Sequence, residues 1–235
     1  MSPALDVLPA GEWGAAVGSL LVRRAAARPG LRLCLPTGET PIPAYAAFAA
    51  AGGRLDDAEV FLLDEFDLPD GHPSRCDEML QRDLLDLLDA PPGALHRLDV
   101  AAEDLDRECA RFCALIAAGG LDLTLLGIGT NGHLGLNEPG SAIDSTCRVV
   151  DLHPDTARRA GDYGDGAAPR RGATIGIAEI LASREVWLLA TGRRKAEILR
   201  AALRGPVSPE VPASYLQTHP NTMVFADTEA ASLLL

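Results

Sequence analysis

The segment "FLLDEFDLPDGHP" places two adjacent carboxylates, Asp64 and Glu65, directly after a run of apolar residues. A carboxylate at the end of a buried strand is partly desolvated, and desolvation raises its pKa and makes it a better proton acceptor. We therefore predict that Asp64 is a general base and keep Glu65 as a secondary candidate. A cation site that also uses Asp67 is an alternative, but no histidine cluster follows, so we expect no metal. Helix capping or solvation is the ordinary alternative for each carboxylate.

His133 and Glu138 share the segment "GTNGHLGLNEPG", which follows the apolar run "LDLTLLGI". An imidazole that is oriented by a carboxylate transfers protons well near neutral pH. A lone histidine is more often structural, but this one lies at the end of a predicted strand together with other polar groups. We predict that His133 and Glu138 form a proton-transfer pair.

The same segment contains Gly127, Gly129 and Gly132 in the G-x-G-x-x-G spacing of dinucleotide-binding proteins. In that fold the third glycine begins a long helix, whereas Gly135 and Pro139 would interrupt a helix here. We therefore expect no nicotinamide or flavin cofactor. The glycines are better interpreted as positions where the backbone approaches a small ligand closely.

Two other segments could bind an anion. "PTGETP" leads into a predicted helix with Thr40 as its N-cap, and the backbone N–H groups at a helix start attract phosphate. Lys195, the single lysine among 21 basic residues, follows the apolar run "EVWLLAT" and could supply a positive charge. Glu39 opposes this role unless its carboxylate points away from the ligand, and an ordinary capped turn is the alternative.

All four segments follow predicted strands, and the strands alternate with predicted helices. We expect strands at 31–36, 59–64, 121–129, 185–191 and 222–227, shorter ones near 95–98, 147–152 and 173–177, and helices at 10–29, 41–52, 76–88, 102–120 and 192–205. This order predicts a single α/β domain over residues 1–235, with a Rossmann-like, open, mostly parallel sheet and helices on both faces. Ligands bind such sheets at the carboxyl ends of the strands. The segment 153–172 is expected to be a lid, with an inert surface loop as the alternative.

The composition limits the partners. A net charge of −12 and the lack of a basic stripe argue against nucleic acid, so we expect a small-molecule ligand. The sequence has no apolar run long enough to cross a membrane and no secretory signal, and we expect a cytoplasmic protein. The five scattered cysteines predict no disulfide framework. A homo-oligomer is left open.

Taken together, "LPTGETP", "LLDEFDLP", "GIGTNGHLGLNEPG" and "TGRRKAEIL" resemble the motifs of the glucosamine-6-phosphate deaminase/isomerase family, in the family's order and over nearly the whole chain. The superfamily also includes 6-phosphogluconolactonases, which differ at "NEPG", so the deaminase branch is favoured. The segments "GGLDLTLLGIGTNGHLGLNEPG", "RGATIGIAEILASREVWLLATG" and "VPASYLQTHPN" are most similar to the galactosamine-6-phosphate deaminase/isomerase subgroup. The configuration of the substrate at C4 therefore stays open.

The resemblance implies a role for each matching residue. Asp64 would abstract the proton at C2 of the open-chain aminosugar and return it at C1, and His133, oriented by Glu138, would open the ring. Asn131 stands where some members have an aspartate beside the histidine. Loss of the C2 nitrogen as ammonia leaves a ketose 6-phosphate without a redox cofactor or metal. The 6-phosphate would be held by a set of loop residues and one cation: Thr37, Gly38, Thr40 and Lys195.

Two departures from the family pattern affect the phosphate group. Glu39 replaces a small loop residue, and Asp162 stands where many deaminases have a lid arginine. The candidates to replace that arginine are Arg158, Arg159, Arg170 and Arg171. The alternative functions are a 6-phosphogluconolactonase or other sugar-phosphate isomerase, and a non-catalytic sugar-phosphate sensor.

Overall fold

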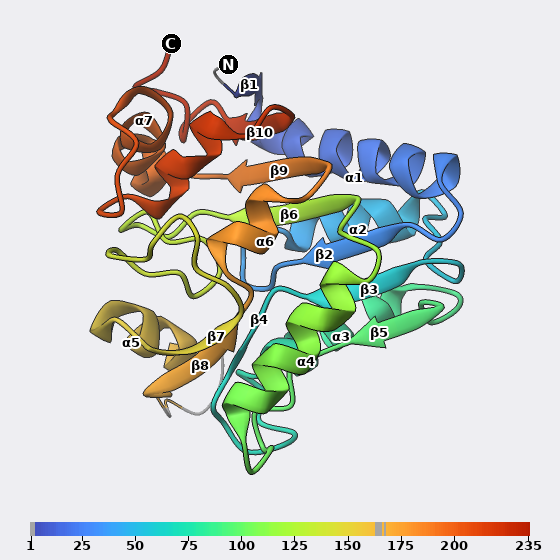
Figure 1. The fold of residues 1–235 in the computed structure, drawn as a ribbon. Helices are drawn as coiled ribbons and strands as arrows, with labels where there is room; N and C mark the ends of the chain where they lie inside the picture. Colours follow the sequence, from blue (N-terminus) through green and yellow to red (C-terminus); the bar gives the residue numbers. More distant parts are fainter. Residues whose placement is uncertain (1–2, 163–165, 167) are drawn as a thin grey trace.

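The large sheet of the computed structural model, which describes residues 3–162, 166 and 168–235, consists of seven parallel strands in the order β1-β10-β9-β6-β2-β3-β5. The strands are β1 (Ala4–Leu8), β2 (Arg32–Leu35), β3 (Glu59–Leu62), β5 (Ala94–His96), β6 (Leu123–Gly127), β9 (Glu185–Ala190) and β10 (Thr222–Asp227). A second, antiparallel sheet has the order β4-β8-β7, with β4 (Asp64–Phe66), β8 (Arg171–Thr174) and β7 (Arg148–Asp151). Figure 1 shows the small sheet beside the large one.

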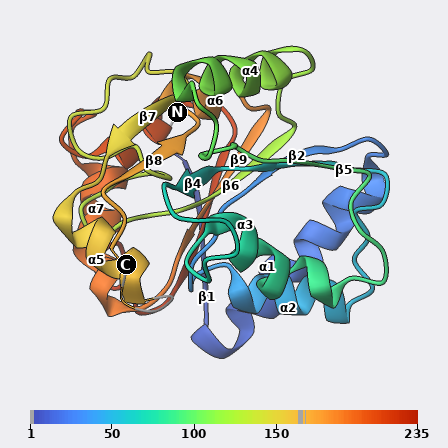
Figure 2. The same cartoon turned by 90° about the horizontal axis from the view of Figure 1, so that it is seen from below.

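Helices cover both faces of the large sheet (Figure 2). One face packs against α1 (Ala10–Ala27), α2 (Ile42–Ala50) and α3 (Cys76–Asp83), and the other against α4 (Leu105–Ala117), α6 (Ile177–Leu181) and α7 (Ala196–Arg204). The remaining α-helix of the described residues, α5 (Pro154–Asp162), lies beside the small sheet. The predicted α/β fold class is therefore confirmed.

Strand β9 shows why the sheet is buried on both faces. Successive side chains of a strand point to opposite faces. In β9, Val186 and Leu188 enter the core under α4 and α7, whereas Trp187 and Leu189 enter the core under α1 and α2. All four are fully buried. A strand that is apolar at every position is typical of a parallel sheet between two layers of helices.

Several predicted boundaries were wrong. The expected strand 59–64 is two strands, because the backbone N–H of Leu63 bonds Leu35 in the large sheet while its carbonyl accepts from Ile175 of the small-sheet side. The sequence analysis also missed β1, α5, α6 and a 3-10 helix over Pro212–Thr218. Each of these elements is short, half-exposed or polar, and so carries a weak periodic signal.

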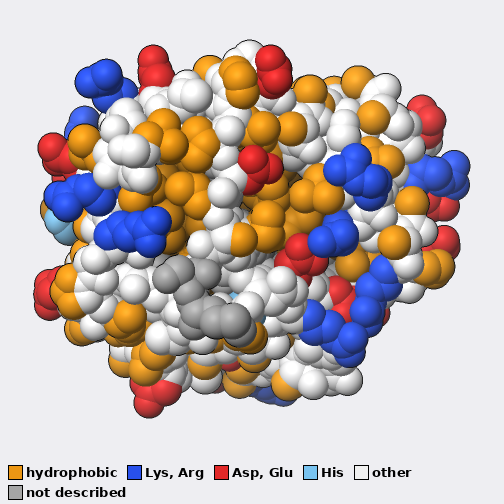
Figure 3. Space-filling model, turned by 90° about the horizontal axis from the view of Figure 1, so that it is seen from above, with side chains coloured by type: hydrophobic (Ala, Val, Ile, Leu, Met, Phe, Trp, Pro, Cys, Tyr) orange, Lys and Arg blue, Asp and Glu red, His pale blue; other side chains and the backbone are white. Residues whose placement is uncertain are grey.

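The surface charges and the helices bear on two expectations about partners, namely nucleic acid and a membrane. On the face seen in Figure 3, the described basic side chains form separate groups at the two sides of a largely hydrophobic middle, with acidic side chains among them. That face offers no continuous basic track among the described residues. None of the helices in the described part of the chain has the length and apolar composition needed to cross a bilayer.

Candidate active site

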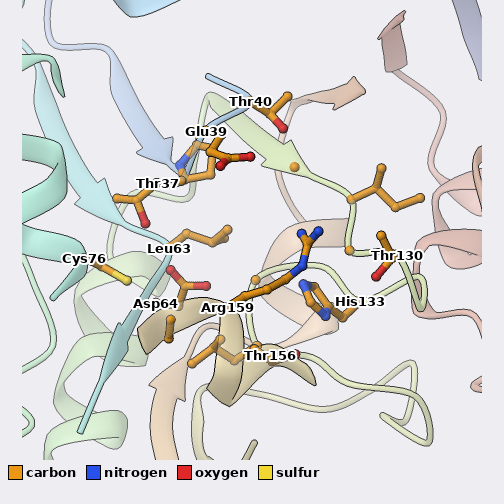
Figure 4. Close-up of a pocket in the computed structure, with 18 of the residues that line it drawn as sticks. Thr37, Glu39, Thr40, Leu63, Asp64, Cys76, Thr130, His133, Thr156 and Arg159 are labelled. Carbon is orange, nitrogen blue, oxygen red and sulfur yellow. The ribbon is translucent and has the colours of Figure 1, made fainter. Parts of the chain in front are cut away.

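A pocket lies where the carboxyl ends of the central strands meet the small sheet and α5 (Figure 4). The loop after β2, the start of β4, the loop after β6, the turn after β9 and the helix α5 all contribute to its wall. These are the four strand exits that the sequence predicted, together with one unpredicted helix. The position agrees with the rule that open parallel sheets bind ligands at the carboxyl ends of their strands.

Asp64 is the buried carboxylate of the pocket. It is the first residue of β4, pairs with Thr174 of β8, and is only 8% exposed. Burial raises the pKa of Asp64 to about 6, against the opposing effects of the Cys76 thiol and of His133. A carboxylate with a raised pKa binds a proton more strongly than an ordinary one and is suited to act as a general base.

Glu65 points away from the pocket because neighbouring residues of a strand face opposite sides. Its buried carboxylate accepts hydrogen bonds from the backbone N–H groups of Cys76 and Asp77 at 2.8 and 3.0 Å. It therefore caps the start of α3, which is the structural alternative considered for it, and it does not line the pocket. Asp67 pairs with Arg171 at 2.9 Å, so the three carboxylates do not converge on a cation.

His133 lies on the opposite side of the pocket from Asp64 (Figure 4). Its Nδ1 is 3.3 Å from Oε2 of Glu138, and the same oxygen accepts a 2.8 Å hydrogen bond from the side-chain amide of Asn131. The other oxygen of Glu138 accepts a 2.5 Å hydrogen bond from the Thr156 hydroxyl. Burial alone would raise the pKa of Glu138, but these partners outweigh it and lower the pKa to about 2. Glu138 is therefore ionised and holds the imidazole in place.

Gly129 explains part of the glycine pattern. A Cβ atom at this position would lie 2.4 Å from ring atoms of His133, so only glycine lets the backbone pass so close to the imidazole. No helix follows Gly132: residues 133–140 form a tight loop with a bridge between Leu134 and Asn137. The predicted interruption of a helix after Gly132 is confirmed, and the close approach that Gly129 permits is to the His133 ring. The approach of this loop to a small ligand stays a prediction.

The loop after β2 brings Thr37, Gly38 and Thr40 to the pocket (Figure 4). Gly38 has a φ of +90°, a backbone conformation that residues other than glycine rarely adopt. The prediction of Thr40 as N-cap was wrong, because the N-cap of α2 is Pro41, whose carbonyl accepts from Ala44 and Tyr45. The helix nevertheless starts beside the pocket, where its positive end favours an anion.

Lys195 lies in the 3-10 turn after β9 and is 5% exposed. Its ammonium group donates to the carbonyl of Ile128, which fixes it at the end of β6. Burial lowers the pKa of Lys195 to about 8, and the nearby charges of Arg159 and Arg194 add to this effect. Three cations thus lie close enough to influence one another, which is the electrostatic setting of an anion site.

Of the four arginines proposed to replace the lid arginine, Arg159 lines the pocket. It extends from α5 into the space between Asp64 and His133 (Figure 4). Arg158 instead pairs with Asp155 at 2.9 Å, and Arg171 pairs with Asp67. Arg170 is exposed and lies outside the pocket wall, as does Asp162 at the end of α5. The expected lid, residues 153–172, includes α5. Residues 163–165 and 167 of this lid lie outside the described residues.

Arg194, Cys76 and Thr156 are among the pocket residues that sequence reasoning did not single out. Arg194 lines the pocket next to Lys195, and Cys76 lines it next to Asp64. Thr156 contacts Glu138 from α5. The segment "TGRRK" contained the signal for Arg194, whereas Thr156 and Cys76 become visible only once α5 and α3 are placed in space.

Fold and pocket together define an α/β protein in which a buried aspartate and a histidine share one pocket with the glycine-containing loop after β2. The chain matches the family model described as glucosamine-6-phosphate isomerases/6-phosphogluconolactonase over residues 11–225. It is 40% identical to a glucosamine-6-phosphate deaminase of Pseudarthrobacter chlorophenolicus, over 96% of this chain and 89% of that protein. A glucosamine-6-phosphate deaminase of Rhodopirellula baltica is also 40% identical, with 98% and 95% covered. The chain belongs to the glucosamine-6-phosphate deaminase family.

The solved structures give the same result. The chain superposes on a monomeric glucosamine-6-phosphate deaminase with a TM-score of 0.92 and 30% sequence identity, covering 98% of this chain and 99% of that one. A 6-phosphogluconolactonase of Thermotoga maritima has a TM-score of 0.77 at 20% identity, with 96% and 99% covered. At that identity the second likeness shows the fold alone. The similarity to deaminases expected from the sequence is confirmed at the level of the family.

Proposed function

We propose that this enzyme converts glucosamine 6-phosphate and water into fructose 6-phosphate and ammonia. The observation that carries the proposal is that Asp64 and His133 line one pocket and that Glu138 contacts the histidine. Asp64 has a pKa raised to about 6, and His133 is held by a Glu138 whose pKa is lowered to about 2. When the surroundings move the pKa values of two carboxylates apart in this way, one carboxylate is suited to proton transfer and the other to orientation.

Each residue has one part in the reaction. His133 moves protons between the ring oxygen and the anomeric hydroxyl and so opens the ring. Asp64 takes the proton from C2 of the open-chain aldehyde and delivers it to C1, while a proton lost from the nitrogen ends on O1. The aldehyde thereby becomes a CH2OH group and the C2–N bond an imine. Water adds to that imine, and the nitrogen leaves as ammonia, so that C2 becomes the ketone. Every step is a proton transfer or the addition or loss of water or ammonia, which general acid–base catalysis accelerates.

The 6-phosphate of the substrate binds in the loop after β2, beside Thr37, Gly38 and Thr40. Lys195 and Arg159 supply positive charge. Arg159 takes the part of the lid arginine, because Asp162 stands at the position where many deaminases have that arginine. Residues 1–235 act as a single domain in this proposal, with 153–172 as the lid. The support is that the loop, both cations and the two proton-transfer groups line one pocket.

The substrate's configuration at C4 separates two versions of the proposal. The curated relatives named above are glucosamine-6-phosphate deaminases, which favours glucosamine 6-phosphate. The sequence similarity to the galactosamine subgroup keeps galactosamine 6-phosphate, its C4 epimer, as the second substrate to test. In both versions of the proposal, Asp64 acts as the base and the loop after β2 holds the phosphate; the support is that both line one pocket.

The test is ammonia release by the purified enzyme with each of the two sugar phosphates, with and without a chelator. We expect release from glucosamine 6-phosphate in both conditions, and none from Asp64→Asn. Hydrolysis of 6-phosphogluconolactone without ammonia release would establish the lactonase alternative. Binding of the sugar phosphates without turnover would establish the sensor alternative.

A further inference from the structure

Glu39 occupies an unusual place for an acidic residue, because it lies inside the loop that faces the anion. Thr37, Glu39 and Thr40 line the same pocket, and Figure 4 shows the Glu39 side chain between the two threonines. Its carboxylate pairs with the guanidinium of Arg194 at 2.6 Å. A carboxylate beside a bound phosphate would repel it, so this position needs an explanation.

The surrounding charges show what Glu39 interacts with. The hydrogen bond to Arg194 lowers the pKa of Glu39, and the charges of Arg159 and Lys195 lower it further. The carboxylate is therefore ionised, paired with Arg194 and within the electrostatic influence of Arg159 and Lys195. All three cations line the pocket, so Glu39 and a bound phosphate would be attracted by the same positive charges.

The two partners of the Glu39–Arg194 ion pair can also separate easily. The side chains of Glu39 and Arg194 are 63% and 50% exposed, so water can replace either partner. Exposed ion pairs contribute little to stability, and their partners can separate at small cost. Lys195, by contrast, is buried and fixed to the backbone carbonyl of Ile128. Arg194 is thus the exchangeable cation of the pocket and Lys195 the fixed one.

We propose that Glu39 is an internal competitor for the substrate phosphate: it holds Arg194 in the empty enzyme, and the phosphate takes Arg194 over when it binds. The inference rests on the proposed function, since it concerns the same phosphate site. Glu39 then weakens phosphate binding and ensures that the cations of the pocket are not left unpaired when the site is empty. Arg194 becomes a phosphate-binding residue in the occupied enzyme.

The experiment measures binding of inorganic phosphate by titration calorimetry at pH 7, without any sugar. The variants are Glu39→Gln, Arg194→Gln and the double variant. Glu103→Gln is the matched control, because it removes the same charge from an exposed residue that does not line the pocket. We expect Glu39→Gln to bind phosphate about twofold to fivefold more tightly than the wild type, in line with the strength of an exposed ion pair.

Competition for Arg194 makes a second prediction. The gain from Glu39→Gln should be smaller in the Arg194→Gln background than in the wild type, because the contested cation is then missing. A Glu39→Gln variant that binds phosphate no better than the wild type would overturn the inference. A gain of equal size in both backgrounds would also overturn it, since Glu39 would then act by repulsion alone.

The experiment separates this inference from the proposed function. Phosphate binding by the wild type, with no gain in Glu39→Gln, leaves the phosphate site and the deaminase proposal standing while the competitor role fails. Absence of phosphate binding in every variant would overturn both. With active enzyme, a variant that binds phosphate more tightly should have a lower KM for the sugar phosphate, and the variants should keep the same order.

Discussion

Asp64 and Glu138 are two largely buried carboxylates that serve one pocket, yet their surroundings act on them in opposite directions. Asp64 faces the pocket with few partners, and burial raises its pKa to about 6. Glu138 lies behind His133 with three side-chain partners, and its pKa falls to about 2. Deeper burial with few hydrogen-bond donors favours a carboxylate that can accept a proton, whereas several donors keep a carboxylate charged.

The largest effect is expected for Asp64→Asn, which keeps the shape but removes the base. Turnover should fall by about 10²–10⁴-fold, the usual contribution of general acid–base catalysis, while inorganic phosphate still binds. Steady-state kinetics and calorimetry check this. Asp67→Asn is the matched control, since Asp67 pairs with Arg171 outside the pocket wall. Full activity in Asp64→Asn would remove this residue from the mechanism.

Replacing Glu138 by glutamine should have a smaller effect, because the side chain acts through His133. Without the carboxylate, the imidazole loses the charged partner that orients it. We expect turnover to fall roughly tenfold to 100-fold. If the kcat of Glu138→Gln matches that of the wild type, Glu138 does not orient the histidine and the contrast between the two carboxylates has no functional meaning.

The same two variants should change stability in opposite directions. The folded pKa of Asp64 lies above the usual 3.8, so its ionised form costs stability as the pH rises through about 6, and Asp64→Asn should stabilise the protein at pH 8. The folded pKa of Glu138 lies below 4.5, so it contributes stability that is lost only as the pH falls towards 2, and Glu138→Gln should destabilise. Urea unfolding should show shifts of roughly 1–3 kcal/mol. Shifts of the same sign would contradict the comparison.

The pH dependence of kcat/KM reports the free enzyme. Below the pKa of Asp64, about 6, kcat/KM should rise by about tenfold per pH unit as the base loses its proton. Above the pKa of Lys195, about 8, it should fall as the ammonium loses its charge. Lys195→Arg should move the alkaline limb to higher pH and leave the acidic limb in place. An alkaline limb that does not move would assign it to another group.

The smallest effect is expected for Thr156→Val, which removes one hydrogen bond to Glu138. The loss of a single hydroxyl should reduce turnover about twofold to tenfold. Thr156→Ser keeps the hydroxyl and should retain most of the activity. If valine and serine behave alike in kinetic assays, the hydroxyl does not contribute to holding Glu138.

The sequence was sufficient to predict most of the large sheet, its two helical layers and several of the pocket residues. Asp64, His133 and Lys195 were found because polar residues that follow apolar strands of a parallel sheet must meet at one edge. The side of β4 that faces the pocket could not be predicted, because it depends on the pairing of Asp64 with Thr174, far away in the chain. Glu65 was therefore kept as a candidate until the structure placed it on the other side.

Other features had no local signal. The edge strand β1 is half-exposed, and its sequence "ALDVL" lacks a clear alternation. Helix α5 is polar and contains glycine, so it was expected to be a loop. Since Arg159 points into the pocket only because α5 is helical, four neighbouring arginines could not be told apart from the sequence. Such choices depend on tertiary contacts rather than on local propensity.

Helix α5 carries both Thr156 and Arg159, which are three positions apart and therefore lie on one side of the helix. Thr156 contacts the carboxylate behind the histidine, and Arg159 reaches into the pocket. A displacement of α5 alters both contacts at once. The hydrogen bond behind the histidine and the position of a pocket cation are therefore coupled through one helix, and neither can be adjusted independently of the other.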